Sequence, residues 1–292
     1  MPLNTASLRD WRFAPVSQRY TDRDTMLYAL SVGFGIDATD PAQLPFVYEK
    51  GLRAVPSMAA VLCHLGAWLR DPCFGVTMAK VVHGEQRMIF HRPLAPEGEL
   101  VAHAHVAGVQ DKGEGKGALV HVERVLSDVA TGEPVVTIVH TTFCRADGGC
   151  ESFGISPQPH ALPARAPDRS AMAAIRPDAA LLYRLNVDRN PLHADPACAQ
   201  RAGFPRPILH GLCTYGIAAR ALLLLVLDGD PSRLLAFDAR FSSVVYPGET
   251  LQVDFWFEAR DVVAFRACVP GRDATVLDNG RAVIRRDGIT QA

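Results

Sequence analysis

The sequence predicts an α+β fold made of two tandem copies of one unit, in which an antiparallel sheet wraps around a helix. Three observations predict it: a pattern of Tyr, Leu, Val, Asp and Pro that occurs twice, an apolar stretch that starts with proline after each copy, and alternating strands after each stretch. The chain has 292 residues, of which 48% are hydrophobic, so it can bury a core of two such units.

The repeated pattern lies in residues 28–41 (YALSVGFGIDATDP) and 183–196 (YRLNVDRNPLHADP), where five residue types recur at identical spacing. An apolar stretch follows each copy, over 56–70 and 207–227, and each stretch opens with a proline suited to the first turn of a helix. We therefore predict one long buried helix in each half. The same features in the same order indicate an ancient duplication.

Matching turns, Pro-Glu-Gly-Glu at 96–99 and Pro-Gly-Glu at 247–249, introduce the predicted strands. Apolar and polar residues alternate after each turn, as they do in half-buried strands. Strands are predicted over 100–106, 117–127, 134–144, 251–257, 262–269 and 274–286. Consecutive strands pair as antiparallel neighbours, and a sheet around one helix hides both apolar faces. This arrangement is the hot-dog, and two copies side by side form a double hot-dog with one continuous sheet.

The segment between the halves breaks every helical or strand period. Residues 145–177 contain five prolines and several glycines, which predicts a linker. The expected division is an N-terminal half at 1–144, the linker at 145–177 and a C-terminal half at 178–292.

Composition excludes several classes of function. The formal net charge of −1 provides no field that would attract nucleic acid or an anionic membrane. The longest apolar run, 217–227, contains Arg220 and is too short to span a bilayer. The N-terminus lacks a signal-peptide pattern, and the seven cysteines lack the spacing of a disulfide framework or a zinc site. We expect a cytoplasmic protein with free thiols, no metal, and neither a nucleic acid nor a membrane as partner.

Residues 183–216 carry the clearest sign of chemistry. Asp188, Asn190 and His193 lie within six residues, and Pro191 disfavours a regular helix at Asn190. In a loop their side chains can converge, so that the carboxylate and the imidazole hold one water and the amide fixes it. Clusters of Asp, Asn and Pro are also common in plain turns with a surface histidine, and spacing alone leaves that alternative open.

Gly211 lies near the start of the predicted second helix. Because it has no side chain, a substrate carbonyl can approach its backbone N–H with the help of the helix dipole. A base, an acid and an oxyanion donor would then come from one short segment.

These motifs resemble a known family. Residues 183–216 are similar to the hydratase 2 motif of the MaoC-like dehydratases, in which Y-R-L-S-G-D-x-N-P-L-H-x-D-P is followed by A-G-F and P-I-L-H-G-L-C-T. Residues 20–33, 46–49 (FVYE), 83–86 (HGEQ) and 111–118 (DKGEGKGA) resemble the first half of two-domain hydratase 2 proteins, which occur alone or in peroxisomal multifunctional enzymes.

The resemblance implies a hydro-lyase that carries out reversible syn hydration of trans-2-enoyl-CoA to (3R)-3-hydroxyacyl-CoA, with the CoA thioester as substrate and no cofactor. It implies that Asp188 and His193 activate the water and deliver a proton to C2, that Asn190 positions the water, and that the Gly211 N–H polarises the thioester carbonyl. The family's Ser-Gly before the aspartate is Asn186-Val187 here. This departure bears on the shape of the pocket.

Four further residues are expected close to the substrate. Tyr183 and Arg184 can orient the catalytic loop or contact a CoA phosphate. Lys112 and Lys116 can meet CoA phosphates, although a hairpin turn explains the glycines around them equally well.

Two motifs of the first half and one histidine have alternative interpretations. Glu49 either supports the site or is a buried carboxylate with backbone donors. HGEQ is expected to be a turn with a structural Glu85. His210 is expected to pack at the helix start rather than transfer a proton.

The repeat also predicts a single catalytic site. The first-half positions that match Asp188 and His193 are Gly33 and Ala38, which cannot transfer protons. We expect that half to form a wide pocket for long or branched acyl chains, and we expect exposed sheet edges to pair in a homodimer. The alternative functions are a hot-dog acyl-CoA thioesterase and a non-catalytic acyl-CoA binding protein.

Overall fold

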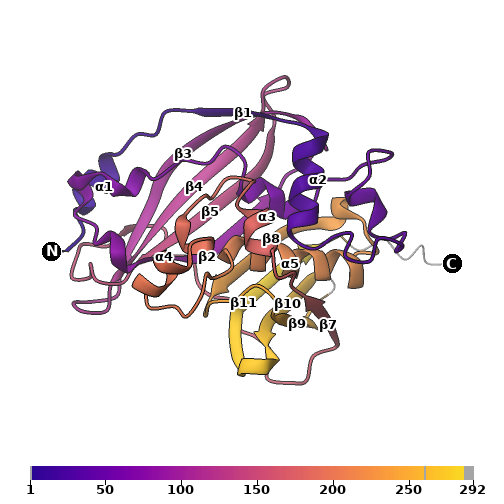
Figure 1. Ribbon diagram of the computed structural model, residues 1–292. Helices are drawn as coiled ribbons and strands as arrows, with labels where there is room; N and C mark the ends of the chain where they lie inside the picture. Colours follow the sequence, from indigo (N-terminus) through magenta and orange to yellow (C-terminus); the bar gives the residue numbers. More distant parts are fainter. Residues whose placement is uncertain (1, 260, 286–292) are drawn as a thin grey trace.

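The computed structural model describes residues 2–259 and 261–285. Its framework is one 11-stranded antiparallel sheet with the order β1-β3-β4-β5-β2-β8-β11-β10-β9-β7, and β6 pairs with β3 (Figure 1). The strands are β1 (Val16–Tyr20), β2 (Val81–Phe90), β3 (Gly98–Asp111), β4 (Ala118–Asp128), β5 (Pro134–Cys144), β6 (Phe153–Gly154), β7 (Arg169–Ala174), β8 (Leu234–Phe241), β9 (Thr250–Phe257), β10 (Val262–Val269) and β11 (Ala274–Ile284).

Helices α2, α3 and α5 gather in front of the middle of this sheet (Figure 1). The α-helices are α1 (Thr5–Asp10), α2 (Asp22–Ser31), α3 (Ala179–Tyr183), α4 (Pro196–Arg201) and α5 (Gly211–Leu225). Short 3-10 helices are η1 (Leu44–Phe46), η2 (Pro56–Ala60), η3 (Trp68–Arg70), η4 (Pro72–Phe74), η5 (Met78–Lys80), η6 (Pro191–His193), η7 (Pro231–Arg233) and η8 (Pro270–Arg272).

The two halves join through strands β2 and β8, which pair from Glu85 opposite Arg240 to Ile89 opposite Ala236. This pairing makes the sheet continuous and confirms the predicted double hot-dog. The predicted strands correspond to β3, β4, β5, β9, β10 and β11. Residue 286, the last of the predicted strand 274–286, lies outside the described residues.

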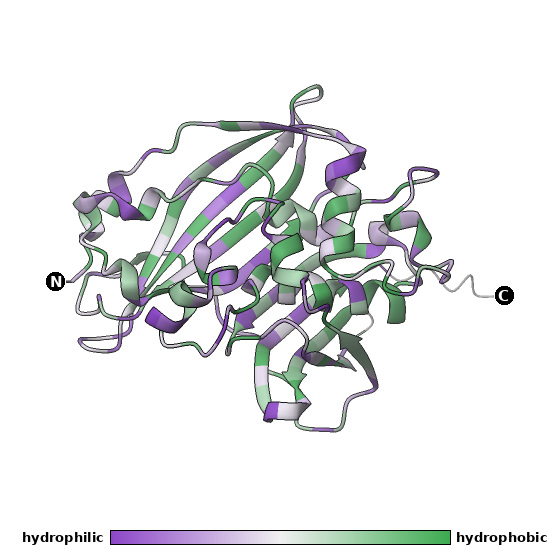
Figure 2. Cartoon of the chain, viewed as in Figure 1, coloured by the Kyte–Doolittle hydropathy of each residue, from purple (hydrophilic) through white to green (hydrophobic). Residues whose placement is uncertain are grey.

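Helix α5 is the buried helix of the second half. Figure 2 shows it as predominantly hydrophobic, and its residues from Cys213 to Leu223 are buried. The helix begins at Gly211, with His210 as its N-cap, and not at Pro207 as the sequence predicted. The reason is that Leu209 donates its N–H to the carbonyl of Val245, which keeps the residues before His210 out of the helix.

The predicted long helix over 56–70 is wrong. The chain forms the short helix η2, turns at Cys63 and Gly66, which have φ of 49° and 69°, and then forms η3. The buried guanidinium of Arg124 donates to the carbonyls of Ala60 and Cys63, which stabilises this irregular path. The left-handed conformations end the helix, and the guanidinium binds carbonyls that a regular helix would use internally. The segment is nevertheless mainly apolar, and residues 56–63 are buried.

Part of the predicted linker belongs to the sheet. Strand β7 lies within residues 145–177 and pairs with β9, from Arg169 opposite Phe255 to Ala174 opposite Thr250. The rest of the segment runs along the sheet, where Asn279 donates to the carbonyl of His160 and Trp256 donates to that of Arg165. The expected division at 1–144, 145–177 and 178–292 stays a prediction.

The seven cysteines are free thiols. Among the described helices, none combines the length and the apolar character that crossing a membrane requires.

Candidate active site

A cavity of about 380 Å³ lies between the two halves and contains the predicted catalytic residues. The second half contributes Val187, Asp188, Asn190, His193, His210 and Gly211 to its wall. The first half contributes Val61, His64, His83, His140 and Arg145. The irregular segment that replaces the first-half helix therefore forms part of the cavity wall.

The loop that carries Asp188 is held by local hydrogen bonds. Oδ1 of Asp188 accepts the N–H of Asn190 at 3.0 Å, and Oδ1 of Asn190 accepts the N–H of Leu192 at 3.1 Å. Pro191 then starts η6, which ends at His193. Asn190 has ψ of 125°, in the extended region that a following proline favours. This geometry places the predicted triad of side chains on one wall of the cavity.

The ring of His193 has a defined tautomer. Its Nδ1 lies 2.9 Å from the carbonyl oxygen of Ile208, and because a carbonyl only accepts, Nδ1 carries the proton. Nε2 therefore presents a lone pair and lies 3.9 Å from Oδ2 of Asp188. This distance is too long for a direct hydrogen bond but allows one water to contact both atoms. Burial lowers the pKa of His193, although the Ile208 carbonyl and the Asp188 carboxylate oppose the shift.

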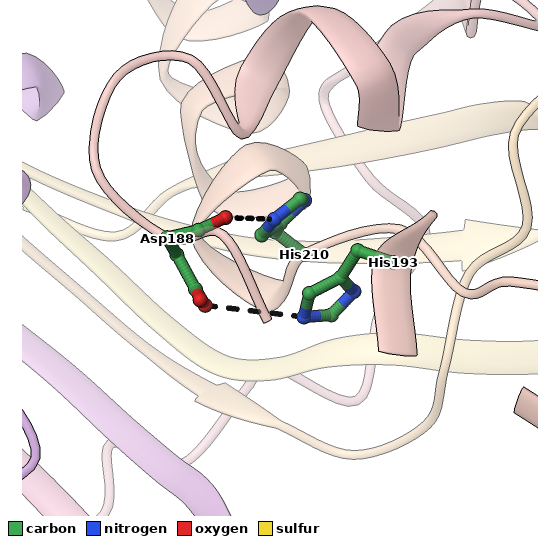
Figure 3. A group of neighbouring side chains, drawn as sticks. All are labelled: Asp188, His193 and His210. Atoms are coloured by element: carbon green, nitrogen blue, oxygen red, sulfur yellow. Dashed lines mark hydrogen bonds and ion pairs between the residues drawn. The ribbon is translucent and has the colours of Figure 1, made fainter. Parts of the chain in front are cut away.

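His210 contacts both members of this pair. Figure 3 shows the Asp188 carboxylate directed toward His193, while the main-chain carbonyl of Asp188 is directed toward His210. Nε2 of His210 donates to that carbonyl at 3.0 Å, and the two imidazoles stack at 3.7 Å. Burial, together with the neighbouring His193, lowers the pKa of His210 to about 4. His210 is buried at the helix start, as the sequence predicted, and its contacts fix the catalytic loop.

Gly211 is the first residue of α5 and lines the cavity. The first helical hydrogen bonds run from Cys213 and Thr214 to the carbonyl of His210, so the N–H of Gly211 precedes them. A Cβ at position 211 would lie 3.1 Å from the Phe241 ring. Any larger residue at this position would require the Phe241 ring to shift by a few tenths of an ångström, because the ring approaches the helix start closely.

The residues before Asp188 anchor the loop. Tyr183 is buried on the cavity wall, with its ring 5.0 Å from that of His210. Nδ2 of Asn186 donates to Oγ of Ser31 in α2 and to the carbonyl of Tyr183. Val187 is not among the described non-glycine residues with positive φ, so the loss of the family's glycine does not strain the backbone.

Arg184 is not among the residues that line the cavity. Its guanidinium donates to the carbonyl of Arg189 at 3.4 Å, and its positive charge acts on His193 and His210. The geometry is that of a residue that orients the loop, one of the two alternatives that the sequence left open.

The structure does not bring Glu49, Lys112 or Lys116 into the cavity. Glu49 is exposed, so the expectation of a buried carboxylate is wrong. Lys112 and Lys116 are exposed in the β3–β4 turn, where glycines 113, 115 and 117 have positive φ as the hairpin alternative requires. Gly117 nevertheless packs against the backbone of Arg145, which lines the cavity.

HGEQ lies in strand β2 and not in a turn, so that prediction is wrong. A β-bulge between His83 and Glu85 interrupts the alternation of side chains along the strand, which explains why the sequence predicted a turn. Glu85 is buried and forms ion pairs with Arg87 at 3.0 Å and with Arg240 at 2.7 Å. Burial raises the pKa of Glu85, but hydrogen bonds from the two guanidinium groups outweigh it and leave the pKa below its usual value.

Three cavity residues of the first half, His64, His83 and His140, were not predicted as part of the site. The rings of His83 and His140 stack at 3.8 Å, and His83 lies 4.5 Å from the ring of Phe241. Burial lowers the pKa of His83 to about 4. The only sequence signal for these residues was the HGEQ motif, because their meeting depends on the pairing of β2 with β5 and β8.

A second site is blocked in the first half. Gly33, which matches Asp188, has φ of 92°, and a Cβ there would lie 3.1 Å from the guanidinium of Arg220. Arg220 is buried in α5 and donates to the carbonyl of Gly33. A cation from the second half thus occupies the space next to the position that matches Asp188.

Asp188, His193 and His210 each offer one possible metal-ligand atom, and these atoms lie within 4.8 Å of one another. Ligand atoms in a tetrahedral zinc site lie about 3.4 Å apart, given zinc–nitrogen distances of about 2.0–2.1 Å. The 3.9 Å between Asp188 and His193 would have to contract for such an ion. The arrangement fits a shared water better than a metal.

Comparison with known proteins finds two family models that together match most of this chain. The family model described as "MFE-2 hydratase 2 N-terminal domain" matches residues 18–146, and the model described as "MaoC like domain" matches residues 159–275. "3-hydroxyacyl-thioester dehydratase Y" of Mycobacterium tuberculosis is 38% identical over 91% of this chain and 93% of its own length. "Enoyl-CoA hydratase 2, peroxisomal" of Arabidopsis thaliana is 37% identical over 88% of each chain.

The fold has solved counterparts as well. The crystal structure of a MaoC-like dehydratase from Phytophthora capsici superimposes with a TM-score of 0.87 and 32% identity, and the match covers 97% of this chain and 98% of that one. The residues matched by the two family models lie in both halves and include the loop with Asp188 and the start of α5. The chain belongs to the two-domain hydratase 2 family of MaoC-like dehydratases, which are hydro-lyases.

Proposed function

We propose that this cavity hydrates trans-2-enoyl-CoA by syn addition to give (3R)-3-hydroxyacyl-CoA, and that it catalyses the reverse dehydration. One observation carries the proposal. The carboxylate of Asp188 and the lone pair of His193 Nε2 face each other 3.9 Å apart, in a cavity that also contains the start of α5. The relatives named as an enoyl-CoA hydratase and a hydroxyacyl-thioester dehydratase support the same reaction in its two directions.

In the proposed mechanism, a water bound between the two groups directs one proton to each of them. His193 Nε2 accepts one proton while the water oxygen forms a bond to C3 of the enoyl group. The electron pair of the double bond moves toward the thioester carbonyl. The protonated His193 then gives its new proton to C2 from the same face, which restores the neutral ring. The other proton stays on the new hydroxyl, so the elements of one water have been added.

The charge that develops on the thioester oxygen needs a donor. The N–H of Gly211 precedes the first hydrogen bonds of α5 and benefits from the positive end of the helix dipole. Removing one such donor typically costs about 3 kcal/mol in the transition state. The amide of Asn190, whose oxygen accepts from Leu192, retains its N–H groups to hold the water.

The rest of the substrate follows from the cavity walls. We infer that Arg145, with the neighbouring turn of Lys112 and Lys116, faces the phosphates of CoA. The acyl chain lies toward Val61, in the space that a regular first-half helix would fill. This placement supports long or branched acyl chains.

The direct test is hydration of crotonyl-CoA and of a long-chain trans-2-enoyl-CoA, followed by the loss of enoyl absorbance and by chiral analysis of the product. We expect the 3R alcohol, and faster turnover of the long-chain substrate. Release of free CoA, measured with a thiol reagent, would instead identify a thioesterase. Tight binding without turnover would identify an acyl-CoA binding protein.

The dependence on pH tests the state of His193. The mechanism needs a neutral ring, and burial holds the pKa of His193 below 6.5. We therefore expect kcat/KM to be constant above pH 7 and to fall as the pH decreases through this lowered pKa, because protonation removes the lone pair of Nε2. If kcat/KM instead decreased as the pH rose above about 6.5, His193 would act as the protonated acid.

We also propose that the protein is a cytoplasmic homodimer. Edge strand β7 exposes Met172 at 64% of its surface, and such an edge is suited to pairing. Light scattering after size exclusion measures the mass, and a monomer at micromolar concentration would contradict the dimer. Some relatives are peroxisomal, so localisation of a tagged full-length chain decides the compartment.

A further inference from the structure

HGEQ is the motif of the first half that the reaction leaves without a role, and it contacts strand β8 on both of its faces. His83 lies on the cavity side, 4.5 Å from the ring of Phe241. Glu85 forms an ion pair at 2.7 Å with Arg240, the residue that precedes Phe241 in β8. Neighbouring residues of a strand point to opposite faces, so the motif holds both sides of the end of β8.

The β-bulge explains how two nearby residues reach opposite faces. In a regular strand, His83 and Glu85 would point to the same side. The register with β5 shifts between them, from His83 opposite Thr142 to Glu85 opposite Thr141, which turns Glu85 away from the cavity. Gly84 occupies the bulge, where a Cβ would lie 3.3 Å from the carbonyl oxygen of Thr141.

Phe241, at the end of β8, in turn packs against the start of α5. Two carbons of the Phe241 ring lie 3.1 and 3.2 Å from the place of a Cβ on Gly211. Phe241 also lies 4.5 Å from the ring of His83, which stacks on His140 at 3.8 Å. Nε2 of His83 lies 3.1 Å from the carbonyl of Glu85 and donates to it, which fixes the ring. A continuous row of packed rings thus runs from β5 of the first half to the oxyanion donor of the second.

From this row we propose that His83 is a positioning residue, which acts through Phe241 to hold the Gly211 N–H in place for the thioester carbonyl. The inference rests on the function proposed above. It gives the first half a part in the reaction, although Gly33 and Ala38 stand there at the positions that match Asp188 and His193. His140 supports His83 from behind, and the ion pair of Glu85 with Arg240 fixes the register of β2 against β8.

The test uses a substrate whose absorbance reports polarisation of the carbonyl. The absorbance of 4-(dimethylamino)cinnamoyl-CoA moves to longer wavelength when its thioester oxygen accepts hydrogen bonds. It is bound to the full chain carrying Asp188→Asn, so that hydration does not consume it. We expect a red shift in this parent, a clearly smaller red shift when His83→Ala is added, and the parent's shift when His83→Phe is added, because phenylalanine keeps a flat ring against Phe241.

Kinetics with the natural class of substrate give a second measurement. Without Asp188→Asn, we expect His83→Ala to lower kcat about tenfold and to change KM by less than about threefold, because the lost interaction forms in the transition state. His83→Phe should restore most of kcat. His103→Ala, at an exposed histidine of β3, is the matched control and should resemble the wild type. Thermal unfolding of each variant identifies any general loss of stability.

The outcomes separate the two proposals. A parent without a red shift would overturn the role of Gly211 in the proposed function. A normal shift in the parent that His83→Ala leaves unchanged would overturn only the positioning role of His83. A lower melting temperature with unchanged kcat and unchanged red shift would show that the row of rings is merely structural.

Discussion

Asp188→Asn is expected to lower hydration of trans-2-enoyl-CoA about 10³-fold, the middle of the range for an essential proton-transfer group. Asparagine has the shape of aspartate, and its oxygen can still accept the N–H of Asn190 that shapes the loop. The atom that faces His193 loses its negative charge, so it can neither accept a hydrogen bond from the water nor stabilise an imidazolium. The measurement is the rate of loss of enoyl absorbance at saturating substrate.

Asp195→Asn is the matched control for this variant. Asp195 caps α4 by accepting the N–H of Ala197, and asparagine caps a helix equally well. It is the same chemical change seven residues further along the chain, and we expect near-normal rates. Wild-type turnover in Asp188→Asn would remove the carboxylate from the mechanism.

His193→Asn should be the second severe variant, with a decrease in kcat of about 10²- to 10⁴-fold. The side-chain nitrogen of asparagine takes the place of Nδ1, so it can keep the hydrogen bond to the carbonyl of Ile208. The variant lacks an equivalent of Nε2, so the water loses the acceptor opposite Asp188. The loss should appear in kcat, because substrate binding does not depend on this lone pair.

An exposed histidine offers the control for this change as well. His91→Asn alters a residue at the end of β2 whose ring meets Thr137 at 2.8 Å, outside the cavity. It should leave the rates unchanged. A His193→Asn variant that retains most of its kcat would show that Asp188 activates the water alone.

The catalytic loop could be predicted because its geometry is local. The side chains of Asp188 and Asn190 each accept the N–H of the residue two positions further on, and sequence spacing determines such bonds. Strands β3, β4, β5, β9, β10 and β11 could be predicted because alternation of apolar and polar residues is a property of each strand alone, whereas β2 and β8, which join the halves, were not predicted. The duplication and the resemblance then supplied the double hot-dog.

The missing first-half helix shows where sequence reasoning failed. Its residues are apolar enough for a buried helix, but the carbonyls of Ala60 and Cys63 bind a guanidinium from β4, and Cys63 adopts a left-handed conformation. A hydrophobic pattern does not reveal a hydrogen-bond partner on a distant strand. His83 was missed for a similar reason, since its neighbours are set by strand register and by a bulge.

The contact between Arg220 and Gly33 determines whether a second catalytic site could be restored in the first half. A carboxylate introduced at position 33 would meet the buried guanidinium and form an ion pair with it, so it would not serve as a base. It would also need a positive φ, which aspartate adopts only at some cost. Removing Arg220 would leave the carbonyl of Gly33 without its donor. A single substitution therefore cannot produce an enzyme with two catalytic sites. The packing of Arg220 against Gly33 keeps the proposed catalytic role in the second half.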